Sequence, residues 1–179
     1  MILIKFLLLF VTLLPTDEKW YRIDTQEEIS FLFPNTSQKL TKMVNGIPSA
    51  IYQTKDLTCV AGVVCTDFSS KNIPFTPENA QFLYDELKNG SLELETARLK
   101  EEKTIPHDSM FIKEIEYTII KDKYEMTYFK RFIFRGNYIY QLSIGGRTRH
   151  LDMIRKEKEI FFNSVSFSVS SKSENKATE

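Results

Sequence analysis

The chain lacks a net charge. Its 179 residues include 24 basic and 24 acidic side chains, which cancel at neutral pH. A protein without an overall positive field does not attract polyanions, so the composition disfavours nucleic-acid binding. No repeat recurs at the period of a solenoid either. Beyond its N-terminal segment the chain has about 160 residues, enough for one domain that buries its core without disulfides or metals.

Cysteine and histidine are scarce, with two of each. Cys59 and Cys65 lie in a strand-like segment where six residues span ~20 Å, whereas a disulfide needs Cα atoms ~4.4 to 6.8 Å apart. We therefore expect two buried thiols. A disulfide, which requires a turn at residues 61–62, is the alternative. The cysteine spacing is not that of a redox or zinc motif, and His107 and His150 are distant in sequence, so no metal ligand and no cofactor is predicted.

Long apolar runs are absent except at residues 1–14, where Lys5 is the single charge. This run predicts an export signal over residues 1–16, and hence a periplasmic, extracellular or secretory-lumen protein. It is shorter than the ~20 residues that cross ~30 Å of hydrocarbon. An uncleaved segment that attaches the protein peripherally to a membrane is the alternative. Residues 17–169 are expected to form a single domain, and residues 170–179 a disordered polar tail.

Aromatic residues are abundant, with 14 Phe and 8 Tyr, and most occur in stretches with strand periodicity. Ile29, Phe31 and Phe33 alternate with other residues as in a half-buried strand within residues 20–33. Further strands are predicted at residues 49–55, 57–68, 97–105, 110–120, 124–135, 138–144 and 165–169, with a loop over residues 35–46 and a bulge at Gly62.

The strands at residues 110–120, 124–135 and 138–144 are separated by short turns, which predict an antiparallel meander. Alternation in the first of them predicts one face in the core and one face in solvent. Gly145 and Gly146 are expected to end the sheet.

Two helices are expected. Thr76, Pro77 and Glu78 offer a capping hydroxyl, a ring suited to the first turn and an early negative charge, so a helix should begin there. It should end at residues 89–90, where Asn-Gly favours a left-handed residue. A second amphipathic helix is predicted over residues 148–163. The fold class is therefore α+β, with a central antiparallel sheet of six or seven strands flanked by two main helices.

Two stretches resemble the PsbP/Mog1-like family. Residues 131–142 (RFIFRGNYIYQL) are similar to the penultimate hairpin of that family, and residues 161–167 (FFNSVSF) resemble its closing segment. The resemblance covers about residues 20–169. It implies an α/β/α sandwich and a non-catalytic accessory, assembly or binding role, and it supplies no catalytic motif.

Two groups of residues carry the types needed for catalysis. His107, Asp108 and Ser109 are the residue types of a hydrolase triad, but consecutive residues in a turn cannot converge as a triad does, so a turn is predicted. Glu114 and Glu116 share one strand face ~7 Å apart, which makes paired-carboxylate chemistry conceivable. We favour a solvated face on which Lys130 or Arg131 pairs with these glutamates.

The best candidate site is a basic cluster that follows the two glycines, formed by Arg147, Arg149, His150 and Arg155. An anionic headgroup, a carboxylate or an acidic patch of a partner could bind there, assisted by free N–H groups at the start of the helix. The alternative is an ordinary solvated helix face. Asn35 and Asn89 also match the N-glycosylation sequon, which matters only in a eukaryotic secretory pathway.

The sequence favours an exported, non-enzymatic accessory or binding protein that contacts a protein partner or a small ligand. A carrier of small apolar ligands is the second hypothesis, and it requires a pocket of ~300 Å³ or more lined by Phe and Tyr. An enzyme is the third, and it requires His107 or His150 to converge with carboxylates in a cleft.

Overall fold

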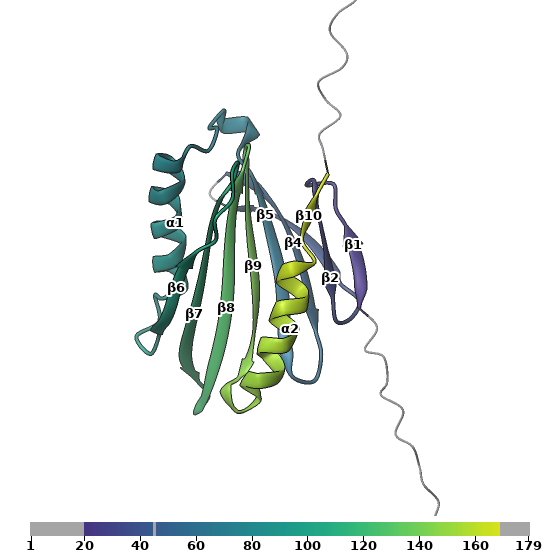
Figure 1. The fold of residues 1–179 in the computed structure, drawn as a ribbon, viewed down its shortest axis with the longest axis vertical. Helices are drawn as coiled ribbons and strands as arrows, with labels where there is room; N and C mark the ends of the chain where they lie inside the picture. Colours follow the sequence, from purple (N-terminus) through teal and green to yellow (C-terminus); the bar gives the residue numbers. More distant parts are fainter. Residues whose placement is uncertain (1–19, 45, 169–179) are drawn as a thin grey trace, which may run out of the picture.

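The computed structural model describes residues 20–44 and 46–168. The predicted export signal at residues 1–16 and the predicted tail at residues 170–179 lie outside this part of the chain. The described residues have an α+β fold with a seven-stranded antiparallel sheet, in the order β3-β4-β5-β9-β8-β7-β6 (Figure 1). A second, three-stranded sheet has the order β1-β2-β10. No helix in the described part is long and apolar enough to cross a membrane.

The elements follow one another along the chain without long gaps. Their bounds are β1 (Tyr21–Asp24), β2 (Ile29–Phe33), β3 (Gln38–Val44), β4 (Ile47–Lys55), β5 (Cys59–Asp67), η1 (Ser69–Lys71), α1 (Pro77–Ser91), β6 (Arg98–Thr104), β7 (Phe111–Lys121), β8 (Tyr124–Arg135), β9 (Tyr138–Arg147), η2 (Thr148–His150), α2 (Leu151–Asn163) and β10 (Ser166–Phe167).

The predicted meander is confirmed as β7, β8 and β9. Asp122 and Lys123 both have positive φ values, 51° and 67°, as a two-residue turn between twisted strands requires. The predicted break at Gly145 and Gly146 is wrong, because β9 pairs with both neighbours through these residues and ends only at Arg147. Two consecutive glycines permit a turn but do not require one. Here the pairing of β9 with β5 and with β8 keeps the strand extended through both glycines.

Both faces of the large sheet carry a core, so the prediction of one solvent-exposed face is wrong. On one face, Ala80 and Tyr84 of α1 pack with Phe132 and Phe134 of β8. On the other face, Ile154, Phe161 and Phe162 of α2 pack in a cluster that includes Leu142 and Ile144. Figure 1 shows the two helices on opposite sides of the sheet, with the small sheet beside α2. That small sheet is an addition to the predicted architecture.

Helix α1 begins as predicted and ends later. Thr76 caps it, and its side chain and that of Asn79 form reciprocal hydrogen bonds with the backbone. The helix passes through the predicted stop at residues 89–90 and reaches Ser91, whose hydroxyl donates to the Leu87 carbonyl. The predicted stop is therefore wrong.

The small sheet joins the two ends of the described chain. Ile29, Phe31 and Phe33 of β2 are buried, as their alternation predicts, and β10 pairs with β2. Glu27, in the turn before β2, connects this sheet to the large one. Its carbonyl oxygen accepts a hydrogen bond from the Tyr140 hydroxyl at 2.8 Å, and its carboxylate accepts one from Tyr52 at 2.7 Å.

The segment from residue 35 to residue 67 departs from prediction in two places. The predicted loop contains β3, which pairs with β4 in an unbroken register. The predicted bulge at Gly62 is absent, since β5 pairs regularly with both β4 and β9 there. Because β5 is straight, Cys59 and Cys65 cannot meet, and both are buried free thiols as expected.

Candidate functional site

Three residues of the predicted basic cluster lie together. Arg147, Arg149 and His150 line one pocket of about 430 Å³, whose opposite wall is the turn between β4 and β5. Arg155 lies elsewhere, on the side of α2 that faces β7, where its guanidinium contacts Glu116 at 3.3 Å. The chain leaves β9 at Arg147 and turns once through η2 before α2 starts, and this turn separates the first three residues from Arg155.

Two glycines allow the walls of this pocket to approach each other. A Cβ atom on Gly145 would overlap the ring of Tyr128, and one on Gly146 would lie well inside van der Waals distance of the Thr58 carbonyl oxygen. Neither glycine has the positive φ that favours glycine elsewhere in the chain. Close approach of neighbouring atoms therefore explains why these two positions lack a side chain.

Replacing Gly146 with alanine is expected to lower the free energy of unfolding by about 2 to 3 kcal/mol, because the added methyl group meets backbone that cannot rotate away. Urea denaturation measures the effect. Gly90 is the matched control, since a Cβ there meets nothing within 4 Å in a helix, and alanine should stabilise by up to about 1 kcal/mol. Equal stability of G146A and wild type would contradict the close packing of this wall.

The cations at the rim have no acidic partner. The Arg147 guanidinium lies 3.8 Å from the centroid of the Tyr124 ring, and Arg149 Nε donates to His150 Nε2 at 3.0 Å. Within residues 20–44 and 46–168, neither arginine forms an ion pair. A guanidinium stacked on a ring keeps its in-plane N–H groups available for an anion. The rim can therefore receive a carboxylate or phosphate without first breaking a salt bridge.

The wall opposite the arginines is acidic and carries a thiol. Asp56 Oδ1 accepts hydrogen bonds from the backbone N–H groups of Thr58 and Cys59 at 2.6 and 2.7 Å, which fixes the turn. Glu157 reaches this turn from α2: Oε1 accepts from the Thr58 hydroxyl at 2.9 Å, and Oε2 lies 2.6 Å from Cys59 Sγ. Sequence analysis missed Glu157, because nothing local connects it to a turn almost a hundred residues earlier.

The electrostatics of this wall oppose nucleophilic chemistry. Burial, together with the nearby carboxylates of Glu157 and Asp56, raises the pKa of the Cys59 thiol. Burial also raises the pKa of Glu157, and the donors on Cys59 and Thr58 offset this only in part. Burial would raise the pKa of Asp56 too, but the backbone N–H groups of Cys59 and Thr58 outweigh it and lower the value. A thiol held in its protonated form is a poor nucleophile.

Within the part of the chain that the structure describes, Asp56, Cys59 and Glu157 form a group that could hold a metal ion. Each offers one ligand atom, and these atoms lie within 4.8 Å of one another. Sequence analysis had named no metal ligand. Binding would require loss of the thiol proton, which the surrounding negative charge opposes until a cation arrives.

The two histidines do not form a catalytic group. His107 lies in the predicted turn, where its Nδ1 accepts from the backbone N–H of Ser109 at 3.2 Å. His107, Asp108 and Ser109 line one pocket of about 250 Å³. Across the described residues, neither His107 nor His150 has a hydrogen bond or ion pair with a carboxylate. The turn interpretation of residues 107–109 is confirmed.

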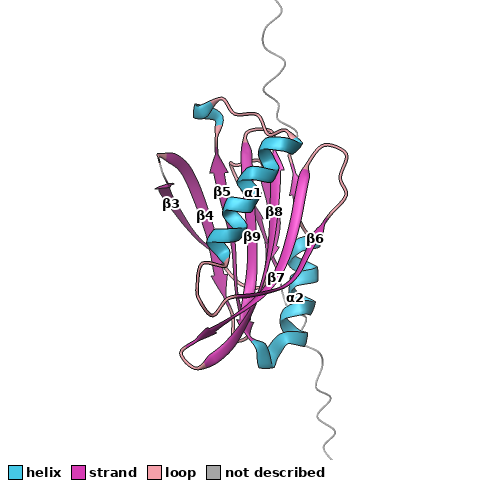
Figure 2. Ribbon diagram, turned by 90° about the vertical axis from the view of Figure 1, so that its left-hand side faces the viewer, coloured by secondary structure: helices cyan, strands magenta, loops and turns pink. Residues whose placement is uncertain are grey.

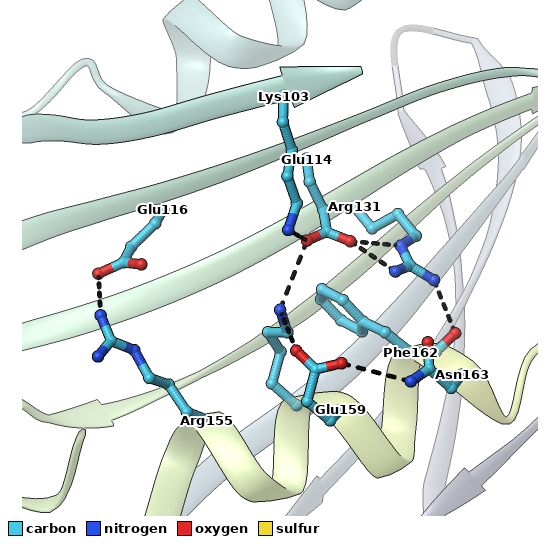
Figure 3. A network of polar contacts seen from close by, with 9 residues as sticks. Lys103, Glu114, Glu116, Arg131, Arg155, Glu159, Phe162 and Asn163 are labelled. Atoms are coloured by element: carbon cyan, nitrogen blue, oxygen red, sulfur yellow. Dashed lines mark hydrogen bonds and ion pairs between the residues drawn. The ribbon is translucent and has the colours of Figure 1, made fainter. Parts of the chain in front are cut away.

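Glu114 and Glu116 belong to a charged network between the sheet and α2 (Figure 3). Glu114 contacts Arg131 at 2.6 Å, Lys103 at 3.1 Å and Lys158 at 3.6 Å. The predicted pairing with Arg131 is confirmed. The predicted solvated face is wrong, because α2 covers Glu114 and leaves it 4% exposed.

Each of the two glutamates contacts at least one cation, Glu114 through Arg131, Lys103 and Lys158 and Glu116 through Arg155. Lys130 is not their partner, and it donates instead to the Ser91 hydroxyl at 2.8 Å.

Comparisons with known proteins identify the fold. No protein-family model and no curated protein matches the chain. Among solved structures, cyanobacterial PsbP from Synechocystis sp. PCC 6803 is similar, with a TM-score of 0.59 and 13% sequence identity, over 84% of this chain and 94% of that one. A protein of unknown function from Pseudomonas aeruginosa also matches, with a TM-score of 0.42 and 14% identity, over 76% and 92% of the two chains. The first match shows a PsbP-like fold, and the second is too distant to support an argument.

Proposed function

We propose that this chain is a non-catalytic binding protein that recognises an anionic group of a partner protein through Arg147 and Arg149. The observation that carries the proposal is that both guanidiniums line a pocket and lack an acidic partner among the described residues. Export, inferred from residues 1–16, would place this activity outside the cytosol.

The contrast with the other arginines supports this assignment. Four of them contact a carboxylate at 3.3 Å or less: Arg22, Arg131, Arg135 and Arg155. The two neighbouring arginines form a positive rim, opposite a wall where Asp56 Oδ1 already accepts from the N–H groups of Thr58 and Cys59. An incoming carboxylate could accept two parallel hydrogen bonds from one guanidinium, which gives both strength and orientation.

The competing functions have less support. The Cys59 thiol is held protonated and the histidines lack carboxylate partners, so no group is activated for catalysis at this pocket. A carrier of apolar ligands calls for an aromatic lining, whereas the pocket of about 490 Å³ beside β3 is lined by polar residues and Val60. The PsbP/Mog1-like resemblance, with its non-catalytic members, agrees with a binding role and a flanking-helix sandwich.

An NMR titration with a short glutamate-rich peptide tests the proposal. Addition of the peptide should shift the amide signals of residues 145–150. The double variant R147Q/R149Q should bind at least about tenfold more weakly, since each charged hydrogen bond contributes roughly 1.5 to 3 kcal/mol.

The matched control is R155Q, which also removes one guanidinium but lies outside the pocket and should bind like wild type. Equal binding by all three proteins, or shifts confined to other residues, would contradict the proposal.

A further inference from the structure

The two edges of the large sheet differ. At one edge, five of the seven residues of β6 are charged, with both signs present, and the register shifts between Leu99 and Glu101. Charged side chains, especially lysines, and bulges are among the usual means by which edge strands avoid pairing with other chains. At the other edge, β3 pairs with β4 without interruption from Gln38 to Val44. Strand β3 lacks the bulge of β6 and has two charged residues, Lys39 and Lys42, where β6 has five.

Nothing in the described chain covers β3. All seven of its residues are exposed, and its outer side has no strand partner. In an antiparallel pair, every second residue of an edge strand directs its N–H and C=O groups outward. A regular strand of this length therefore offers a row of free donors and acceptors to an added strand.

An open apolar surface adjoins this edge. Leu40 lies opposite Ile51, and Ile51 lies opposite Val64, so the three share one face of the sheet. Val64 in turn lies opposite Gln141, and Gln141 lies opposite Phe132. The same face of the sheet therefore leads to Phe132, which packs under α1. The buried cluster beneath α1 takes its strand residues from β7, β8 and β9, and Figure 2 shows β3 and β4 to one side of the helix. On this face Leu40, Val44 and Val60 are 43%, 47% and 51% exposed.

The charge of this edge has one sign. Strands β3 and β4 contain Lys39, Lys42 and Lys55 and no acidic residue. Glu27 neutralises Lys39 at 3.2 Å, whereas Lys42 and Lys55 form no ion pair with any described residue. Two copies of this chain joined through β3 would bring their lysines together, which disfavours a homodimer at this edge. An acidic segment would meet no such repulsion.

We propose that β3 is a docking edge for an extended segment of another protein that carries both apolar and acidic side chains. The segment adds to the sheet beside β3 and completes its outward hydrogen bonds. Its apolar side chains cover Leu40 and Val44, and its carboxylates neutralise Lys42. Lys55 and Val60 also line the pocket of Arg147 and Arg149, whereas Leu40, Lys42 and Val44 do not, so substitutions at Lys42 and at the two arginines test the two interactions separately.

The experiment uses a peptide in which pairs of valines alternate with pairs of glutamates, so that each face of the strand carries both residue types. The amides of residues 38–44 should shift in NMR spectra and become protected from exchange with solvent. The variant K42E should bind this peptide about tenfold more weakly, because reversal replaces an attraction with a repulsion. K42E should also bind the corresponding valine-lysine peptide more tightly than wild type does.

The matched control is K100E, the same charge reversal on the protected edge β6, which should bind like wild type. Absence of protection in β3, or equal binding by K42E and wild type, would overturn the proposal. So would a wild-type dimer in sedimentation experiments whose β3 amides are protected in the absence of any peptide, since the occupant of the edge would then be a second copy.

Discussion

Replacing Phe132 with alanine is expected to lower the free energy of unfolding by about 4 kcal/mol. The side chain is fully buried. Its ring centroid lies 5.4 Å from that of Tyr84, with the two planes at 79°, so it joins the centre of the sheet to α1. Removal of the ring leaves a cavity between two rigid elements that cannot close together around it.

Urea denaturation of F132A measures this loss directly. The matched control is Phe82→Ala, the same substitution on the outer side of α1, where the ring is 66% exposed. F82A should change the free energy of unfolding by less than about 0.5 kcal/mol. A small effect for F132A would mean that α1 does not pack on the sheet through this residue.

Replacing Glu114 with glutamine is expected to cost about 3 to 5 kcal/mol. The substitution keeps the shape of the side chain but leaves Arg131, which is 15% exposed, without its carboxylate partner, whereas Lys158 keeps Glu159 at 2.7 Å. Arg131 retains its hydrogen bond to the Phe162 carbonyl oxygen at 2.7 Å, which cannot neutralise it. The uncompensated positive charge of Arg131 beneath α2 should therefore destabilise the contact between helix and sheet.

The matched control for this prediction is Glu116→Gln. Glu116 pairs with Arg155, which is 52% exposed, and such a pair contributes less than about 1 kcal/mol. Similar losses for E114Q and E116Q would show that the burial of Glu114 has no energetic consequence.

The pH dependence gives a second readout for Glu114. Burial alone would raise the pKa of Glu114, but Arg131, Lys158 and Lys103 hold it below the ordinary value. A carboxyl group with a lowered pKa stabilises the fold above the pKa of the unfolded chain and loses this effect as the pH falls through the folded-state value. The difference in stability between wild type and E114Q should therefore be largest near neutral pH and should shrink in acid.

The elements that the sequence predicts correctly are those whose formation depends on residues close together in the chain. The β7–β8 turn depends on two adjacent residues, Asp122 and Lys123, and α1 begins at a cap that Thr76 and Asn79 form within one helical turn. Strand β3 was missed because none of its residues is buried, so its sequence shows no alternation, and only pairing with β4 makes it a strand. The small sheet was missed because it requires Ser166 to meet Ser30.

The candidate site also combines residues that a local pattern predicts with residues that only the fold brings together. Arg147, Arg149 and His150 lie within four consecutive residues of the sequence, and all three line the pocket. Arg155 was grouped with them by its sequence position, although α2 directs it toward Glu116. The opposite wall depends on contacts between Glu157 and the turn before β5, which no local pattern predicts.

The most direct test of the proposed function is co-purification from the native extracytoplasmic fraction with wild type, R147Q/R149Q and R155Q as baits. We predict that wild type and R155Q retain the same partner and that R147Q/R149Q loses it. Retention of that partner by all three baits would contradict recognition through Arg147 and Arg149.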